Sequence, residues 1–289
     1  MSTKRVQKRD SVYLKIVALL SSVRWKNVLI TAGAQYIAFL FAFNTRQNIL
    51  QSLSKVNVHL IIFSTALILA GGYIINNFYD VEKDLINRPD RTRFQNLISR
   101  GFKLNFYLLL NLAGLGIALY ASPGIFLYFL FYAFVLWFYS HKLSRLVLIS
   151  ELTASFLSVY AFFGLVLYFK MFTLSFFIYG ASMFLILFAR EIFKDIVSLK
   201  GDLITGYKSI STNIGAEASK RLFQSILILS FVLDAGFLWL GDKESFFYIF
   251  GLLAICKLFA VFLIEKQKQL TKRLLQILIL LYILGIIWL

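Results

Sequence analysis

Long apolar stretches alternate with shorter polar segments along the whole chain. A helix needs about 20 apolar residues to cross the ~30 Å hydrocarbon core of a bilayer. We therefore expect an all-α fold, a polytopic membrane helix bundle that forms a single membrane-embedded domain over residues 1–289. The pattern predicts nine transmembrane helices, at residues 16–43, 58–77, 104–121, 125–140, 146–169, 173–190, 222–240, 245–264 and 273–289.

The composition agrees with a membrane protein, because 60% of the residues are hydrophobic and 15% are charged. Soluble proteins have roughly 45–50% and about 25%. The chain has 30 Lys and Arg residues against 14 Asp and Glu residues, an excess that would suggest nucleic acid in a soluble protein. Here 23 of the 30 lie before the first span and in the loops after the second, fourth, sixth and eighth, and the alternate loops carry 4.

This bias predicts the orientation, because cytoplasmic loops are rich in Lys and Arg. We expect an integral protein of the cell (inner) membrane, surrounded by the lipid bilayer, with its amino terminus and basic loops in the cytoplasm. No nucleic-acid partner is expected, and the sequence indicates no obligate protein partner. The single cysteine, Cys256, excludes an intramolecular disulfide.

Acidic residues gather in two of the basic loops, where the positive-inside pattern does not explain them. In the first loop, Asn76, Asp80 and Asp84 recur every four residues and fall within about 80° of one helix face if the second helix continues. Carboxylate oxygens select hard cations such as Mg²⁺, which also binds phosphate. The alternative is a solvated helix end whose acids balance the nearby bases.

The second loop repeats this arrangement at the end of the sixth span. Glu191, Asp195, Ser198 and Asp202 fall within about 60° if Gly201 does not break the helix. Two acidic faces interleaved with bases, both at interior helix ends, suggest two halves of one site. Carboxylates, Mg²⁺ and basic side chains together are what a diphosphate needs.

Three stretches carry a resemblance to a known family. Residues 76–91, which end in Asp-Leu-Ile-Asn-Arg-Pro-Asp-Arg, and residues 190–215 resemble the two signatures of the UbiA superfamily of intramembrane prenyltransferases. Residues 139–145, Tyr-Ser-His-Lys-Leu-Ser-Arg, resemble the loop between that family's fourth and fifth helices. With nine spans the resemblance covers essentially the whole chain, and it is closest to the digeranylgeranylglyceryl-phosphate synthase-like branch.

The resemblance implies a reaction and a site. The reaction is transfer of a polyprenyl group from its diphosphate to a lipophilic acceptor, either a glycerol-phosphate lipid or an aromatic quinone precursor. The implied cofactor is Mg²⁺, held by Asp80 and Asp84 on one side and by Asp195 and Asp202 on the other; these four are the expected catalytic residues. The expected substrate-binding residues are Arg24, Asn27, Asn76, Arg88, Tyr139, Lys142, Arg145 and Lys194.

The chain departs from the family pattern at three single positions, and the Pro-Ser-Gly that usually follows the first signature is also absent. Asn77 and Ser198 stand where the family usually has Asp, and Glu151 stands where many relatives have Asn. If the two lost acids weaken Mg²⁺ binding, Asn77→Asp and Ser198→Asp should reduce the Mg²⁺ requirement. A carboxylate within a span, such as Glu151, is a functional candidate, although one near a helix end also reaches the interface by snorkelling.

Two other functions remain open on the sequence alone. A catalytically degenerate relative would explain Asn77 and Ser198. A cation-coupled secondary transporter would need ionisable residues near the midplane, where the chain offers Lys257 and Asp234. For Arg24 and Asn27, interfacial snorkelling is the alternative to a role in binding.

Overall fold

A computed structural model of the chain describes residues 2–43, 48–240, 244–265 and 267–288, and these residues form helices and no strands. The helices, in chain order, are α1 (Ser2–Ser22), α2 (Trp25–Ile37), the π-helical turn η1 (Ala38–Ala42), α3 (Ile49–Leu53), α4 (Val56–Tyr79), α5 (Val81–Asn87), α6 (Pro89–Gln95), α7 (Arg100–Ala121), α8 (Pro123–His141), the 3₁₀ turn η2 (Leu143–Arg145), α9 (Ile149–Phe169), α10 (Leu174–Thr205), α11 (Ile210–Ile214), α12 (Ala216–Leu240), α13 (Glu244–Leu263), α14 (Lys268–Gly285) and the 3₁₀ turn η3 (Ile286–Trp288).

Six helices in the described part of the chain are long and apolar enough to cross a membrane. They are α4, α7, α8, α9, α10 and α12, which cover six of the nine predicted spans. The other three predicted spans are also helical, but they do not meet the same criteria of length and apolar composition, so the count of nine is not confirmed. Among the six, α4 and α10 are the most buried.

The first predicted span, residues 16–43, is not one helix. The chain leaves the helical conformation between α1 and α2, where Arg24 has a φ of 50° in the left-handed region. A residue in that region cannot continue a right-handed helix. Residues 16–43 therefore comprise the end of α1, all of α2 and the turn η1, and the break places Arg24 next to the start of α2.

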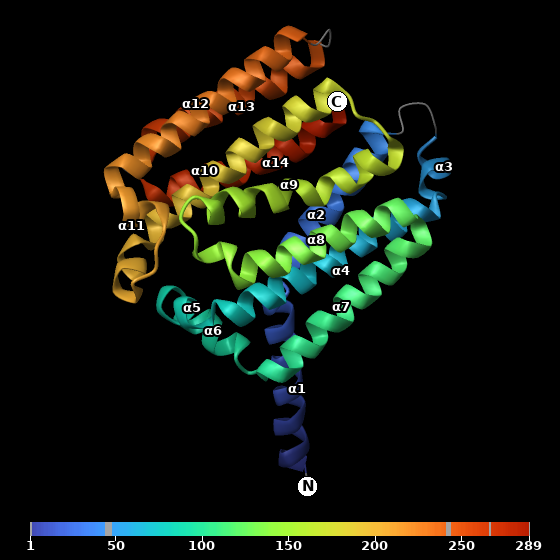
Figure 1. Cartoon of the computed structure of the whole chain (residues 1–289), viewed down its shortest axis with the longest axis vertical. Helices are drawn as coiled ribbons and strands as arrows, with labels where there is room; N and C mark the ends of the chain where they lie inside the picture. The colour runs from blue at the N-terminus through green and yellow to red at the C-terminus, as the bar shows by residue number, and fades with distance from the viewer. Residues whose placement is uncertain (1, 44–47, 241–243, 266, 289) are drawn as a thin grey trace. The chain divides into compact units, whose positions relative to one another are not determined.

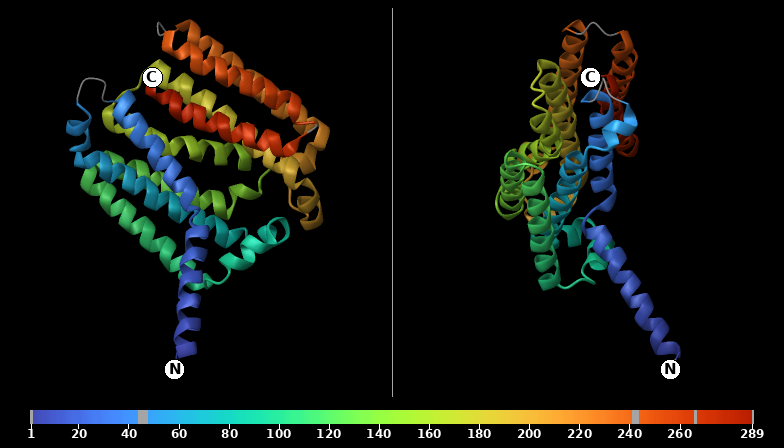
Figure 2. Two further views of the ribbon diagram at one scale, coloured as in Figure 1. Left: turned by 180° about the vertical axis from the view of Figure 1, so that it is seen from behind. Right: turned by 90° about the vertical axis from the view of Figure 1, so that its right-hand side faces the viewer.

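The chain forms two compact units, which are described separately: residues 1–32 and 59–142 make the first, and residues 33–58 and 143–289 make the second. In the first unit, small residues let α4 approach α7 and α8. A Cβ atom added at Gly114 of α7 would lie 2.8 Å from Ile68 of α4, and one added at Gly72 of α4 would lie 3.0 Å from Leu136 of α8. Close approach at small residues is typical of membrane helices. Figure 2 shows α1 projecting away from α7 and α8.

In the second unit, α10 is the central helix. It contacts α9, α11, α12 and α14, and Figure 1 shows α9 running alongside it in the opposite direction. Thr173 caps its amino end, and Gly206 ends it with a φ of 65°. The helix continues 15 residues beyond the predicted end of the sixth span at 190, so the second acidic cluster lies on its last turns.

Candidate active site

The first acidic cluster lies where α4 ends. The condition that the second helix continues is not met here, because Asp80 leaves the helical conformation, with φ −93° and ψ 10°, and α5 begins at Val81. The spacing survives the interruption: the Asp80 amide donates to the Asn76 carbonyl at 3.0 Å, and the Asp84 amide donates to the Asp80 carbonyl at 2.9 Å. The Asn76 side chain also donates to Asp80 Oδ2 at 2.6 Å. The side chains of Asn76 and Asp80 are thus hydrogen-bonded to each other.

The surroundings of Asp80 favour a cation. Burial raises the pKa of Asp80, and the charge of Asp84 raises it further, whereas Lys83, the Asn76 hydrogen bond and Arg24 act in the opposite direction. A carboxylate whose ionised form is penalised by burial and by a second carboxylate is stabilised by a bound positive ion. The donor chemistry here, two carboxylates and an amide oxygen, is that of a Mg²⁺ site.

Three arginines of the first unit bring positive charge to the same region. Burial lowers the pKa of Arg91, and the charges of Arg24 and Arg88 lower it further, while Asp84 raises it. The guanidinium groups of Arg24 and Arg88 are therefore close enough to repel that of Arg91, an arrangement that an anion stabilises. Arg91 was not among the predicted site residues; the influence of Arg24 and Arg88 on it places it in this region.

Arg24 and Asn27 converge on one side chain that the sequence analysis missed. The Arg24 guanidinium lies 5.1 Å from the centre of the Tyr73 ring, and the Asn27 amide donates to the Tyr73 hydroxyl at 3.4 Å. Tyr73 lies one helical turn before Asn76 on α4. Both predicted residues therefore belong with the first cluster, and Tyr73 connects them to it.

Asn77 is engaged elsewhere. It is buried, its amide donates to Gln95 Oε1 at 2.9 Å, and its Oδ1 accepts from Lys103 Nζ at 2.8 Å. Gln95 in turn donates to the Ser21 carbonyl at 3.0 Å. The side chain that replaces the family's usual Asp thus connects α4 to α6 and α7. Lys103, counted from the sequence as a loop charge, is 1% exposed.

The segment formed by the end of α8 and the turn η2 spans the boundary between the two units. His141 stacks on Trp137 and lies against Tyr79, with ring centres 5.4 Å apart in both pairs. Tyr139 is half-buried and Lys142 is exposed, both in the first unit, whereas Arg145 is exposed in the second. The aromatic partner of Tyr79 in this segment is therefore His141, which the sequence analysis did not single out.

The second acidic cluster lies on an unbroken helix, because α10 continues through Gly201. Ser198 Oγ donates to Asp202 Oδ2 at 2.7 Å, and Asp202 is fully buried. The carboxylate of Asp195, which is partly exposed, accepts from the backbone amide of Ile210 at 3.3 Å, so α11 folds back onto α10. The side chain that replaces the second expected Asp is thus bonded to a neighbouring acid.

Lys194 already has a carboxylate partner. Its ammonium group is bonded to Glu191, which is buried and also accepts from Arg190 Nη2 at 2.9 Å. A phosphate contact by Lys194 would have to compete with this ion pair. Glu191 is neutralised by its two basic neighbours and is not available as an additional cation ligand.

Several buried polar atoms of the second unit accept or donate no hydrogen bond. They include Glu151 Oε2, Arg190 Nε and Ser211 Oγ. Buried polar atoms are nearly always paired with protein, water or ligand, so these orphans suit a polar ligand. No group of three or more His, Cys, Asp or Glu side chains in the described residues is arranged to hold a metal ion by itself. Two protein carboxylates with waters and substrate phosphates are nevertheless a usual Mg²⁺ environment.

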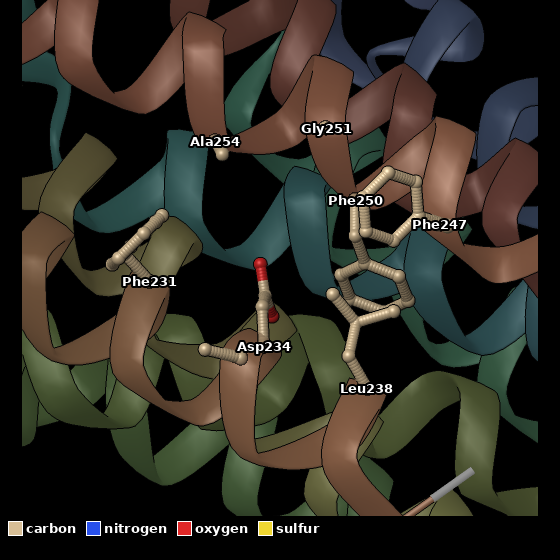
Figure 3. A pocket seen from close by; sticks show the side chains of 8 residues that line it. Phe231, Asp234, Leu238, Phe247, Phe250, Gly251 and Ala254 are labelled. Atoms are coloured by element: carbon tan, nitrogen blue, oxygen red, sulfur yellow. The ribbon is translucent and has the colours of Figure 1, made fainter.

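Another polar cluster lies within the helices of the second unit. The carboxylate of Asp234 is bonded to the Lys257 ammonium group. The Tyr282 hydroxyl donates to Asp234 Oδ1 at 2.9 Å and accepts from Lys257 Nζ at 2.8 Å. Asp234 also faces a cavity of about 140 Å³, and Figure 3 shows its carboxylate among the rings of Phe231, Phe247 and Phe250. The ionisable groups that a transporter would use are thus bound to each other.

The sequence model of the UbiA prenyltransferase family matches residues 28–286 of the chain. The chain belongs to the UbiA prenyltransferase family. It is therefore an enzyme that transfers prenyl groups, and the match extends over both units and both acidic clusters. The resemblance noted in the sequence is confirmed.

Relatives in this family are similar over most of their length. The chain is 26% identical to digeranylgeranylglyceryl phosphate synthase of Sulfolobus acidocaldarius over 252 residues, 87% of this chain and 88% of that protein. It is 23% identical to the protein of the same name from Sulfurisphaera tokodaii over 242 residues, 83% and 84% of the two chains. Among solved structures, a UbiA homologue from Archaeoglobus fulgidus bound to GPP and Mg²⁺ has a TM-score of 0.72 and 17% identity, covering 94% of this chain and all of that one. This last likeness is one of fold.

Proposed function

We propose that the protein catalyses Mg²⁺-dependent transfer of a polyprenyl group from a prenyl diphosphate to the hydroxyl of a glycerol-phosphate lipid. The observation that carries the proposal is the first cluster, in which Asp80 and Asp84 repel each other beside Arg24, Arg88 and Arg91. The two carboxylates place like negative charges side by side, and the arginines place like positive charges beside them. A magnesium diphosphate supplies the complement of both.

The four predicted carboxylates would hold Mg²⁺, Asp80 and Asp84 from the first unit and Asp195 and Asp202 from the second. When bound, the ion would neutralise the charge that develops on the departing diphosphate. Asn76 positions Asp80 through the hydrogen bond of 2.6 Å between their side chains. Asp202 is fully buried and accepts from Ser198, so its carboxylate would have to become accessible to the ion.

Basic residues would bind the diphosphate oxygens. Arg24, Arg88 and Arg91 are the primary candidates, because the charges of Arg24 and Arg88 already act on Arg91. Lys142 and Arg145 are exposed and have no assigned carboxylate partner in the ion pairs of the described residues, so both can reach a phosphate. Lys194 is a weaker candidate because of its bond to Glu191. Fixed guanidinium groups stabilise the leaving group without reorganisation during the reaction.

The acceptor proposal rests on the relatives. The proteins from Sulfolobus acidocaldarius and Sulfurisphaera tokodaii are named for a product with two geranylgeranyl groups on glyceryl phosphate. The corresponding acceptor carries one such group and a free hydroxyl. We also propose that the protein lies in the cell membrane with both acidic clusters on the cytoplasmic side, as the Lys and Arg bias predicts.

An acceptor comparison tests this proposal. Purified protein would be given MgCl₂ and labelled geranylgeranyl diphosphate with either monogeranylgeranylglyceryl phosphate or a hydroxybenzoate ring. We expect label in the glycerol-phosphate lipid at a rate at least tenfold above that in the ring. Preference for the ring would overturn the acceptor, and label in neither would overturn the transfer reaction.

A further inference from the structure

Glu151 has a buried carboxylate that the proposed roles leave unused. The residue lies in the first turn of α9, is 5% exposed, and its Oε2 accepts no hydrogen bond. Burying a carboxylate oxygen without a partner is costly, most of all in a membrane protein. The snorkelling alternative needs the carboxylate at the water interface, and the burial of Glu151 argues against it. A carboxylate kept buried without a partner is therefore expected to bind a ligand or to take part in catalysis.

The position of Glu151 follows from the pairing of α9 with α10. These neighbouring antiparallel helices are joined by residues 170–173. Glu151 lies 18 residues before the end of α9, about 27 Å, and Glu191 lies 17 residues after the start of α10, about 26 Å, at a rise of 1.5 Å per residue. Glu151 is therefore level with Glu191, at the start of the second acidic cluster.

A second contact supports this placement. The Tyr207 hydroxyl, which follows α10, is bonded to the backbone carbonyl of Ser144, which precedes α9. The beginning of α9 is thus tied to the end of α10. Two other orphan atoms, Arg190 Nε and Ser211 Oγ, belong to α10 and α11 at this same end of the unit.

The other carboxylates of this end already have partners. Glu191 is paired with Arg190 and Lys194, Asp202 accepts from Ser198, and Asp195 accepts from the Ile210 amide. Each of these carboxylates therefore already has an oxygen engaged by a neighbouring donor. Glu151 differs, because one of its oxygens is buried and open.

We propose that Glu151 accepts the proton of the acceptor's hydroxyl group during prenyl transfer, an inference that rests on the proposed function. The acceptor oxygen forms a bond to the first carbon of the prenyl group, and the bond from that carbon to the diphosphate oxygen breaks. The diphosphate leaves with the electron pair of the broken bond. The hydroxyl proton moves to the open oxygen of Glu151, and solvent removes it after product release.

Isosteric and shortened variants test the assignment. Glu151→Gln keeps the shape but cannot accept a proton, so we expect transfer to monogeranylgeranylglyceryl phosphate to fall by about 10²–10⁴-fold. The dissociation constant of geranylgeranyl diphosphate, measured with Mg²⁺ and no acceptor, should change less than twofold. Glu151→Asp should restore part of the rate. The matched control is Glu217→Gln, which removes a solvent-exposed carboxylate of α12 in the same unit and should leave both quantities unchanged.

The binding and stability measurements separate a proton acceptor from a residue with a purely structural role. An unchanged transfer rate in Glu151→Gln would overturn the inference and leave the proposed function standing. If Glu151→Gln and Glu151→Asp lose diphosphate binding and thermal stability to the same extent, Glu151 has a structural role, and the inference is overturned in that case too. If the parent protein binds prenyl diphosphate but transfers the prenyl group to no acceptor, both the proposed function and the role of Glu151 are wrong.

Discussion

Asp80 is the residue at which charge and burial oppose each other most directly. Its pKa is raised by burial and by Asp84, so ionisation of Asp80 is less favourable in the folded protein than in the unfolded chain. The free energy of unfolding of the metal-free protein therefore decreases as pH rises from the ordinary Asp value through the raised one. By the same shift, Mg²⁺-dependent activity should be lost on acidification at a higher pH than an ordinary Asp would give.

Asp80→Asn removes the buried charge and with it the repulsion from Asp84. We expect the metal-free variant to unfold at a higher temperature than the parent near neutral pH, and its turnover to fall by roughly 10²-fold or more. Thermal unfolding with and without MgCl₂ measures the first effect and pyrophosphate release the second. Asp90→Asn, an exposed acid in α6, is the control. A less stable Asp80→Asn protein would contradict this reading of the site.

Asn77→Asp should not reduce the Mg²⁺ requirement, contrary to the expectation from sequence. Asn77 Oδ1 already accepts from the buried Lys103 ammonium at 2.8 Å, so a carboxylate there would form an ion pair with Lys103. Asn77→Leu would leave Lys103 and Gln95 short of a partner and should cost about 1–3 kcal/mol of stability. A magnesium titration compares the variants with the parent. A clearly lower requirement in Asn77→Asp would show that position 77 does reach the ion.

Asp80 and Asn77 show which contacts of the site the sequence could indicate and which it could not. The four-residue spacing of Asn76, Asp80 and Asp84 is local, and it survives even the end of α4 at Tyr79. The partners of Asn77 and Tyr73 come from other helices, 18 to 46 positions away in the chain. No short-range pattern encodes such contacts, so Tyr73, Gln95 and Lys103 were missed.

At the scale of helices, a buried ion pair joins α12 to α13 in the second unit. The Asp234 and Lys257 side chains are 7% and 2% exposed and are bonded to each other. Lys257→Met should therefore destabilise the protein by about 3–5 kcal/mol, because it leaves Asp234 buried without its counter-ion. Asp234→Leu combined with Lys257→Met should recover most of that loss. Thermal unfolding of the single and double variants measures it; additive losses would show that the pair is not coupled.

Helix boundaries were predictable where hydrophobicity decides them. The apolar pattern located all six helices that qualify as spans, because about 20 apolar residues leave a chain in lipid few alternatives to helix. It failed where a backbone conformation intervenes, at Arg24, and where a helix continues into polar sequence, at the last 15 residues of α10. At Arg24 the hydrophobicity gives no sign of the break, and in α10 the hydrophobicity falls although the helix continues.

At the scale of the whole molecule, the loop charges predict that Asn87 and Lys200 lie on the same, cytoplasmic side of the membrane. The single native cysteine makes this testable: in a Cys256→Ser background, Asn87→Cys and Lys200→Cys should both react with a membrane-impermeant thiol reagent from the cytoplasmic side only. Lys170→Cys, between α9 and α10, should react from the opposite side. Labelling of Asn87→Cys and Lys200→Cys from different sides would overturn the predicted topology.

The family assignment covers residues 28–286, and the central claim is that this chain is a working enzyme that needs Mg²⁺ at its acidic clusters. The most direct test is release of pyrophosphate from labelled geranylgeranyl diphosphate by purified protein, with acceptor lipid, across a magnesium titration. We expect release that depends on Mg²⁺, stops with excess chelator, is abolished by Asp84→Ala and is retained by Asp90→Ala. No release by correctly folded parent protein would show a catalytically degenerate relative, and full activity of Asp84→Ala or in excess chelator would contradict the metal site.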